Sequence, residues 1–263
     1  MRRLLLHLYG PINIYSYGLC IACAALISVH AFTHDPRFKT LKLEPIFSSL
    51  FFVGALSILV GGRILHLFTV HEDTIHTIDL ISFWEPGFSV LGSLITVLVC
   101  VPLYLYWQRI PVLPCIDLIA TYAGLLQGIS RLGCFFAGCC FGCASNVGWA
   151  VSYTDPTSIA PLHVSLHPVQ LYSAMLLLLI FIGMYTIGRH MLKIPGQQIM
   201  VYVTLSSLER FVTDFWRGDR TFFTALTIPL SINQCIALLL VIISSIVFLR
   251  ITYYTPPRAH EYI

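Results

Sequence analysis

Long apolar runs dominate this sequence and follow one another along almost its whole length. A run of roughly 18 or more apolar residues is long enough to cross the hydrocarbon core of a bilayer as a helix. Hydrophobic residues make up 57% of the chain and charged residues 10%, against about a quarter charged in soluble domains. A soluble core cannot bury that much apolar surface. The sequence therefore predicts an all-α, polytopic integral membrane protein.

We predict about seven transmembrane helices in a single transmembrane domain that covers residues 1–263. The segments are about 14–32, 46–68, 88–107, 112–141, 168–187, 199–216 and 228–250. The fourth is longer than one crossing requires and rich in glycine, so it is either partly re-entrant or a helix packed tightly on its neighbours. Pro11, Asn13 and Gly18 interrupt the first apolar run, which argues against a cleaved signal peptide.

The distribution of lysine and arginine between the segments predicts the orientation in the membrane. With seven crossings, the two termini lie on opposite sides of the membrane. The basic residues on the side of the C-terminus are Arg37, Lys39, Lys42, Arg109, Arg189, Lys193, Arg250 and Arg258. Those on the side of the N-terminus are Arg2, Arg3, Arg217 and Arg220. Because cytoplasmic loops carry the excess of basic residues, we expect an outward N-terminus and a cytoplasmic C-terminus. The formal charge of +3 is too small to indicate nucleic acid binding.

Charged side chains within the apolar segments carry the functional signal, because each costs at least a few kcal/mol without a partner, a wet cavity or a ligand. Arg131 lies in QGISRLGCFFAGCCFG among apolar and small residues. On a continuous helix it would share a face with Gly124, Gln127, Cys134, Gly138 and Gly142. Such a bare face either lets another helix approach or leaves room for a ligand. A guanidinium next to such a space is suited to binding a phosphate group, through two parallel hydrogen bonds.

A second basic group lies in LERFVTDFWRGDR, where Arg210, Asp214 and Arg217 recur at spacings of four and three. This spacing places them on one face of a helix. Arg210 and Asp214 can neutralise each other without a ligand, but Arg217 leaves that face net positive. We predict that Arg131 and Arg210 bind one anionic lipid headgroup together. Arg63, in GGR, either joins the same site or extends its charge to the membrane interface.

Four cysteines follow Arg131 closely: Cys134, Cys139, Cys140 and Cys143. Their spacing does not match the C-x2-C pairs of a zinc ribbon. On a continuous helix Cys140 would also point away from Arg131. Packing of small side chains is the favoured interpretation, with a disulfide second and a metal third, so we expect no metal site. No cofactor is indicated.

An ordered series of short motifs extends over nearly the whole chain. The motifs are GP-x-x-I-x-x-YGL (Gly10 to Leu19), GGR (Gly61 to Arg63), WE-x-G (Trp84 to Gly87), Asp117, RLG-x-F-x-x-G-x-x-x-G (Arg131 to Gly142), HP-x-QLY (His167 to Tyr172), RF-x-x-acid-x-x-R (Arg210 to Arg217) and Gln234. Each motif is weak alone, but together and in this order they resemble those of the prolipoprotein diacylglyceryl transferases of bacterial inner membranes.

The resemblance implies a seven-helix enzyme of the inner membrane, in which the outward N-terminus predicted from the basic residues is periplasmic. Its reaction moves the diacylglyceryl group of the membrane lipid phosphatidylglycerol onto the lipobox cysteine thiol of a prolipoprotein, and glycerol 1-phosphate leaves. The resemblance places Arg131, Arg210 and Tyr17 in catalysis. The predicted substrate-binding residues are Arg131, Arg210, Gly138, Gly142, Asp214, Arg63 and Arg217.

The chain also departs from the pattern of that family. Leu91 stands where the pattern has a histidine, Cys134 and Cys139 stand for asparagine and glutamate, and Asp214 stands for glutamate. The proton acceptor for the thiol is therefore not identified. Two other interpretations stay open: a relative that binds phospholipid without catalysis or uses its own thiols, and a small anion transporter. A transporter predicts matched broken helices in two halves, which we do not find.

Overall fold

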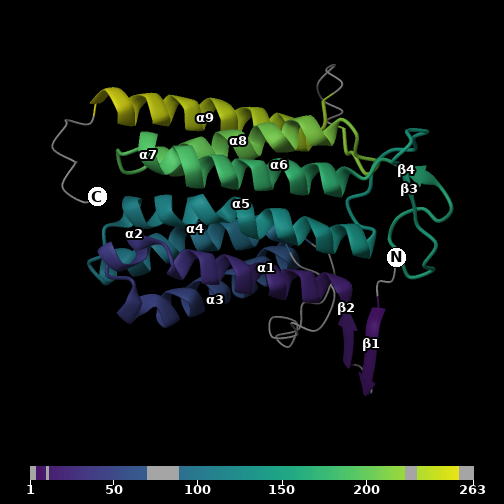
Figure 1. Ribbon diagram of the computed structural model, residues 1–263, viewed down its shortest axis with the longest axis horizontal. Coiled ribbons are helices and arrows are strands. Elements are labelled where there is room, and N and C mark those ends of the chain that lie inside the picture. Colours follow the sequence, from purple (N-terminus) through teal and green to yellow (C-terminus); the bar gives the residue numbers. More distant parts are fainter. Residues whose placement is uncertain (1–3, 10–11, 70–88, 223–229, 255–263) are drawn as a thin grey trace. The chain divides into compact units, whose positions relative to one another are not determined.

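The computed structural model describes residues 4–9, 12–69, 89–222 and 230–254, and this part of the chain is mostly helical (Figure 1). Its long helices are α1 (Ser16–Thr33), α3 (Phe47–Thr69), α4 (Val90–Trp107), α5 (Val112–Ala137), α6 (Val169–Gly183), α8 (Gln197–Asp214) and α9 (Ile232–Tyr254). Each of them overlaps one of the seven predicted segments. The all-α expectation is confirmed.

Shorter elements connect these helices. They are the helix α2 (Pro36–Thr40), the 3-10 turn η1 (Glu44–Ile46), the π-helix η3 (Met184–Gly188), the helix α7 (Arg189–Met191) and the strands β1 (Leu4–Tyr9), β2 (Ile12–Tyr15), β3 (Val151–Ser152) and β4 (Ser165–Leu166). β1 pairs with β2 and β3 with β4, both antiparallel. The π-helix links α6 to α7, so that one apolar stretch runs from Val169 to Met191. The sequence did not predict either hairpin.

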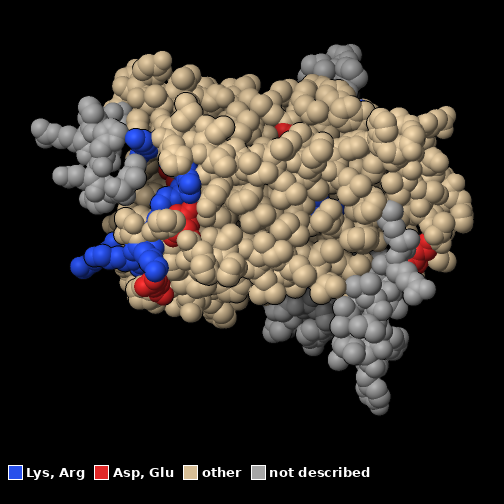
Figure 2. Space-filling model, viewed as in Figure 1, with Lys and Arg blue, Asp and Glu red and all other residues tan. Residues whose placement is uncertain are grey.

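Five of the helical stretches are long and apolar enough to cross a membrane: Ser16–Thr33, Glu44–Phe68, Val112–Ala137, Val169–Met191 and Ile232–Tyr254. The apolar part of α4 is shorter, and α8 carries three charged residues, Glu209, Arg210 and Asp214. Much of the surface visible in Figure 2 has no charged side chain. The chain is a multi-pass membrane protein. Seven crossings stay a prediction, as does one domain over residues 1–263.

The described residues form two compact units, one within residues 1–35 and 117–263 and the other within residues 36–116. In the second unit α3 and α4 pack through glycine. A methyl group at Gly92 would lie 2.1 Å from the carbonyl oxygen of Gly61, so only glycine permits this approach. The Ser93 hydroxyl donates to the Ile58 carbonyl across the same interface at 2.8 Å.

In the first unit the glycines of α5 allow α6 to approach closely. A methyl group at Gly124 would lie 2.9 Å from the carbonyl oxygen of Leu177, and one at Gly128 would lie 2.9 Å from Cγ of Leu178. The packed-helix alternative for this segment is therefore the one observed. The predicted end at residue 141 was wrong, because Gly138 adopts a φ of +74° and turns the chain out of the helix after Ala137.

α8 lies between α6 and α9 (Figure 1), and α5 holds its N-terminus. The Asp117 carboxylate accepts hydrogen bonds from the backbone N–H groups of Gly196 at 2.7 Å and Ile199 at 2.8 Å. These amides belong to the first turn, where no helical carbonyl is available to them. Farther along, the hydroxyls of Thr204 and Ser244 are 2.7 Å apart and join α8 to α9. The buried charge of Asp117 thus serves to position α8.

Candidate active site

The chain segments after α5 and α8 run antiparallel and join the ends of these two helices. Gly142 pairs with Arg217, and the Cys143 N–H donates to the Trp216 carbonyl at 2.8 Å. A methyl group at Gly142 would lie 2.3 Å from the carbonyl oxygen of His167. Only glycine fits this approach without displacing backbone. The pairing brings the sequence after Arg131 next to the sequence after Arg210.

Asp214 is fully buried at the end of α8 and lies among three guanidiniums. Its Oδ1 is 3.9 Å from Nη2 of Arg210 and 4.0 Å from Nε of Arg217. Its Oδ2 is 3.6 Å from Nε of Arg220 and accepts a hydrogen bond from the Ser231 hydroxyl. Among the described residues, Oδ1 receives no hydrogen bond. The contact to Arg210 is therefore an ion pair beyond hydrogen-bond distance, which leaves N–H donors of Arg210 for another anion.

Two of these arginines are fixed by further partners. Arg217 donates to both carboxylate oxygens of Asp219, from Nε at 2.8 Å and from Nη2 at 2.6 Å. Arg220 donates from Nη2 to Oε1 of Gln234 at 2.8 Å. The Gln234 side chain also bonds to the backbone of α8, through Phe211. Gln234, in the first turn of α9, thus holds Arg220 beside Asp214.

Arg131 belongs to the same neighbourhood. Its charge acts on Arg210 together with that of Arg217, and it is also an electrostatic neighbour of Tyr17. Gly133 packs on α1, where a methyl group would lie 3.3 Å from ring atom Cδ2 of Tyr17. The first unit therefore brings Arg131, Arg210 and Tyr17 together. Their part in catalysis stays a prediction.

The charges of this neighbourhood do not balance. Its guanidiniums, those of Arg131, Arg210, Arg217 and Arg220, outnumber its acidic groups, which are the carboxylates of Asp214 and Asp219 and the thiol of Cys140. An excess of positive charge in a low dielectric attracts an anion strongly. The side chain of Arg210 is 28% exposed, so it is accessible to such a ligand.

Three cysteines come together beside these arginines. The Sγ atoms of Cys134, Cys139 and Cys140 all lie within 4.8 Å of one another. The expectation that Cys140 points away from Arg131 assumed a continuous helix. α5 instead ends at Ala137, the positive φ of Gly138 and that of Cys140, +57°, turn the chain back, and the charge of Arg131 acts on Cys140.

The thiols of this cluster differ in acidity. Hydrogen bonds with Cys134 and Cys139, together with the charges of Arg217 and Arg131, lower the pKa of Cys140 far below its usual range. Hydrogen bonds with the other two thiols and burial raise the pKa of Cys139. Cys140 is therefore the thiol of this cluster that most readily forms a thiolate, because positive charge stabilises it.

Gln170 and Tyr153 hold the turn that carries Cys139. Gln170 Nε2 donates to the Cys139 carbonyl at 2.8 Å, and the Tyr153 hydroxyl donates to the Phe135 carbonyl at 3.0 Å. Burial raises the pKa of Tyr153 to about 12, so the hydroxyl stays a donor at neutral pH. Sequence reasoning missed both roles, although the HP-x-QLY motif contains Gln170. Nothing in the sequence singles out Tyr153.

Other predicted site residues take different places. Gly138 is a turn residue, and a methyl group there would lie 2.1 Å from Oγ of Ser158. The predicted helical face with Gly138 and Gly142 was wrong, because α5 ends before both. Arg63 is buried on α3 in the second unit, and its binding role stays a prediction. The WE-x-G motif at 84–87 and the basic residues at 2, 3 and 258 lie outside the described residues.

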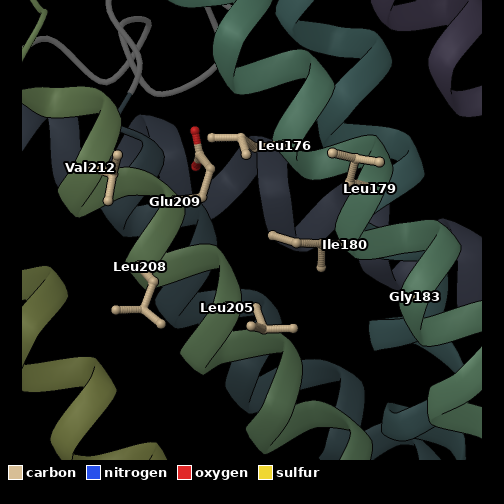
Figure 3. A pocket seen from close by; sticks show the side chains of 8 residues that line it. All are labelled: Leu176, Leu179, Ile180, Gly183, Leu205, Leu208, Glu209 and Val212. Atoms are coloured by element: carbon tan, nitrogen blue, oxygen red, sulfur yellow. The ribbon is translucent and has the colours of Figure 1, made fainter.

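An apolar groove of about 430 Å³ lies between α6 and α8. Its lining is Leu176, Leu179, Ile180, Gly183, Leu205, Leu208, Glu209 and Val212 (Figure 3). Glu209 is the charged member of this lining, and it accepts hydrogen bonds from the hydroxyls of Ser173 and Thr213. Aliphatic walls of this kind suit a hydrocarbon chain.

The fold and the site define a multi-pass helical membrane protein with a cluster of arginines at the end of helix α8. A sequence model described as prolipoprotein diacylglyceryl transferase matches residues 3–250, and the chain belongs to this family. Among its relatives are proteins named phosphatidylglycerol–prolipoprotein diacylglyceryl transferase. The protein of Clostridium tetani is 29% identical over 94% of this chain and 97% of its own length. The protein of Idiomarina loihiensis is 27% identical over 94% of this chain and 91% of its own length.

Proposed function

We propose that this chain transfers the diacylglyceryl group of phosphatidylglycerol to the lipobox cysteine thiol of a prolipoprotein. Membership of the family and the names of the relatives support the reaction and both substrates. Within the molecule, the excess of guanidiniums around Arg131 and Arg210 is the observation that carries the proposal. The phosphate of the lipid donor supplies the anion that this excess requires.

In the proposed reaction Arg131 and Arg210 bind the phosphate of the donor lipid. The acceptor thiol gives up its proton to water, and its sulfur attacks the glycerol carbon that carries the phosphate ester, so a C–S bond forms while the C–O bond breaks. The electron pair of the broken bond passes to the phosphate oxygen, and glycerol 1-phosphate leaves. Guanidiniums aimed at this growing charge stabilise the transition state more than the ground state. Asp214 holds Arg210 in place, since its buried carboxylate lies 3.9 Å away.

The groove between α6 and α8 supports a diacyl donor. Its walls are aliphatic apart from Glu209, and α8 contributes both to the groove and to the phosphate site through Arg210. We propose that one acyl chain of the donor lies along this groove. The headgroup then reaches the arginines at the end of the same helix.

We further propose that the chain lies in the bacterial cytoplasmic membrane with a periplasmic N-terminus. The excess of lysine and arginine on the side of the C-terminus supports this orientation. In it, Arg217 and Arg220, which follow α8, lie on the periplasmic side. A prolipoprotein that has been exported but is still anchored presents its cysteine on that side.

Expression of the chain in bacteria depleted of their own transferase tests the proposal. We expect growth and lipoprotein modification to return. A matched strain expresses the Arg131→Ala variant at the same membrane level and serves as the control for catalysis. If the parent chain inserts normally but restores neither property, the chain is a relative that does not catalyse the transfer.

A further inference from the structure

The cluster of three thiols in the first unit is a feature that the proposed reaction leaves unused. We propose that Cys134, Cys139 and Cys140 bind one thiophilic metal ion of the zinc type, and that the remaining coordination position of this ion takes the acceptor thiol. The metal site stands on the geometry of the cysteines alone. The role toward the acceptor rests on the proposed function.

The distances between the sulfur atoms suit a shared metal ion. Zinc binds thiolate sulfur at about 2.3 Å in tetrahedral geometry, which separates two sulfur ligands by about 3.8 Å. The three Sγ atoms already lie within 4.8 Å of one another. Small side-chain rotations therefore close the site. The sequence-based expectation of no metal rested on the spacing of the cysteines and on a continuous helix, and the structure replaces that helix by a turn after Ala137.

The backbone holds the three cysteines in this arrangement before any ion binds. Cys134 lies in the last turn of α5, and Cys140 has the left-handed φ of +57°, which is sterically unfavourable for a residue with a side chain. Gln170 fixes the carbonyl of Cys139 at 2.8 Å. The turn thus brings Cys139 and Cys140 back toward Cys134, which lies in α5.

The surrounding charges also favour a thiolate site. Three thiolates and one divalent ion carry a net charge of one negative unit, which needs compensation in a low dielectric. Arg131 and Arg217 are electrostatic neighbours of Cys140 and supply positive charge. All three cysteines are partly exposed rather than sealed in the core, so an ion has access to them.

A metal with three protein ligands is typical of catalytic rather than structural zinc, because the fourth position stays open to substrate. A thiol that binds there loses its proton, which passes to water, and becomes the nucleophilic thiolate. The three thiols and Arg131 share Tyr17 as an electrostatic neighbour. A metal-bound acceptor thiolate would therefore lie beside the phosphate that Arg131 binds, ready to form the C–S bond.

Metal analysis of the purified full-length protein, prepared under reducing conditions without chelators, tests the site. With zinc as the probe, we expect one ion per chain. Serine substitution at Cys134, Cys139 or Cys140 should each remove most of the bound zinc, while Cys143→Ser, in the same segment but outside the cluster, should keep it. Size-exclusion profiles show which variants fold. Absence of stoichiometric zinc from the parent protein, or retention of zinc by all three folded variants, overturns the site.

Cobalt(II) in place of zinc tests the acceptor role without any transfer reaction. We expect the sulfur-to-cobalt charge-transfer band to intensify when a lipobox peptide with cysteine is added, and to stay unchanged with the serine peptide. An unchanged spectrum with both peptides overturns the acceptor role. Undiminished transfer by the metal-free protein overturns it as well. A cobalt response without any lipid transfer, in contrast, supports the site and contradicts the proposed function.

Discussion

Replacement of Asp214 by asparagine removes a negative charge from among three guanidiniums without changing the size of the side chain. The carboxylate is fully buried and lies 3.6 to 4.0 Å from Arg220, Arg210 and Arg217. At an effective dielectric constant of about 20, one such pair interacts by about 4 kcal/mol. Desolvation of the charges offsets part of this energy. Removal of one partner from a buried ion pair typically costs about 3 to 5 kcal/mol, and exposure of Arg210 favours the lower value.

Equilibrium unfolding of the detergent-solubilised protein measures this cost. We expect Asp214→Asn to lower the free energy of unfolding by about 3 kcal/mol. Asp219→Asn is the matched control, because Asp219 also pairs with Arg217 but its side chain is 37% exposed. An exposed pair contributes about 1 kcal/mol or less. Equal losses from the two variants would refute the reasoning that Asp214 is the buried counter-ion of the arginines.

Further predictions concern packing, the groove and orientation. Gly142→Ala should destabilise the protein by about 1 to 3 kcal/mol, because the added methyl group meets the His167 carbonyl at 2.3 Å, whereas Gly148→Ala, with nothing within 4 Å, should be neutral in thermal unfolding. Ser173→Ala removes a hydrogen bond to buried Glu209 and should cost about 1 to 3 kcal/mol in the same assay. A reporter fused to the C-terminus should be active only in the cytoplasm, and an outward-facing reporter would contradict the predicted orientation.

The positions of the helices could be predicted from the sequence because a membrane imposes both length and apolar character on each span. The end of α5 could not. Gly138 was placed on a helical face with Gly124 and predicted to bind substrate, although its positive φ turns the chain out of the helix. Composition alone does not distinguish these two uses of glycine. The β1–β2 hairpin was missed for a related reason, since Ile12–Tyr15 continues directly into the apolar sequence of α1.

The arginines of the site could be selected from the sequence by the cost of placing charge in a membrane, and the spacing of four also gave the partner of Arg210, Asp214. The further partners could not be predicted. Ser231, just before α9, bonds to Asp214, and Gln234, in the first turn of α9, bonds to Arg220 only through the fold. That the charge of Arg131 acts on Cys140 could not be predicted from the sequence either. It depends on a turn in the chain rather than on the spacing of residues along a helix.

Transfer of labelled diacylglyceryl from phosphatidylglycerol to a lipobox peptide, by purified lysine variants of the two central arginines, tests the account most directly. Lysine keeps the charge but loses the planar pair of donors. Arg131→Lys and Arg210→Lys should each lose about 2 to 4 kcal/mol of transition-state stabilisation, or roughly thirty- to a thousandfold in rate. The double variant should lose less than the sum of the two, because both residues serve one phosphate. Arg189→Lys, on α7, should transfer at the parent rate. Near-parent rates from both single variants would contradict the proposal that these arginines bind the phosphate.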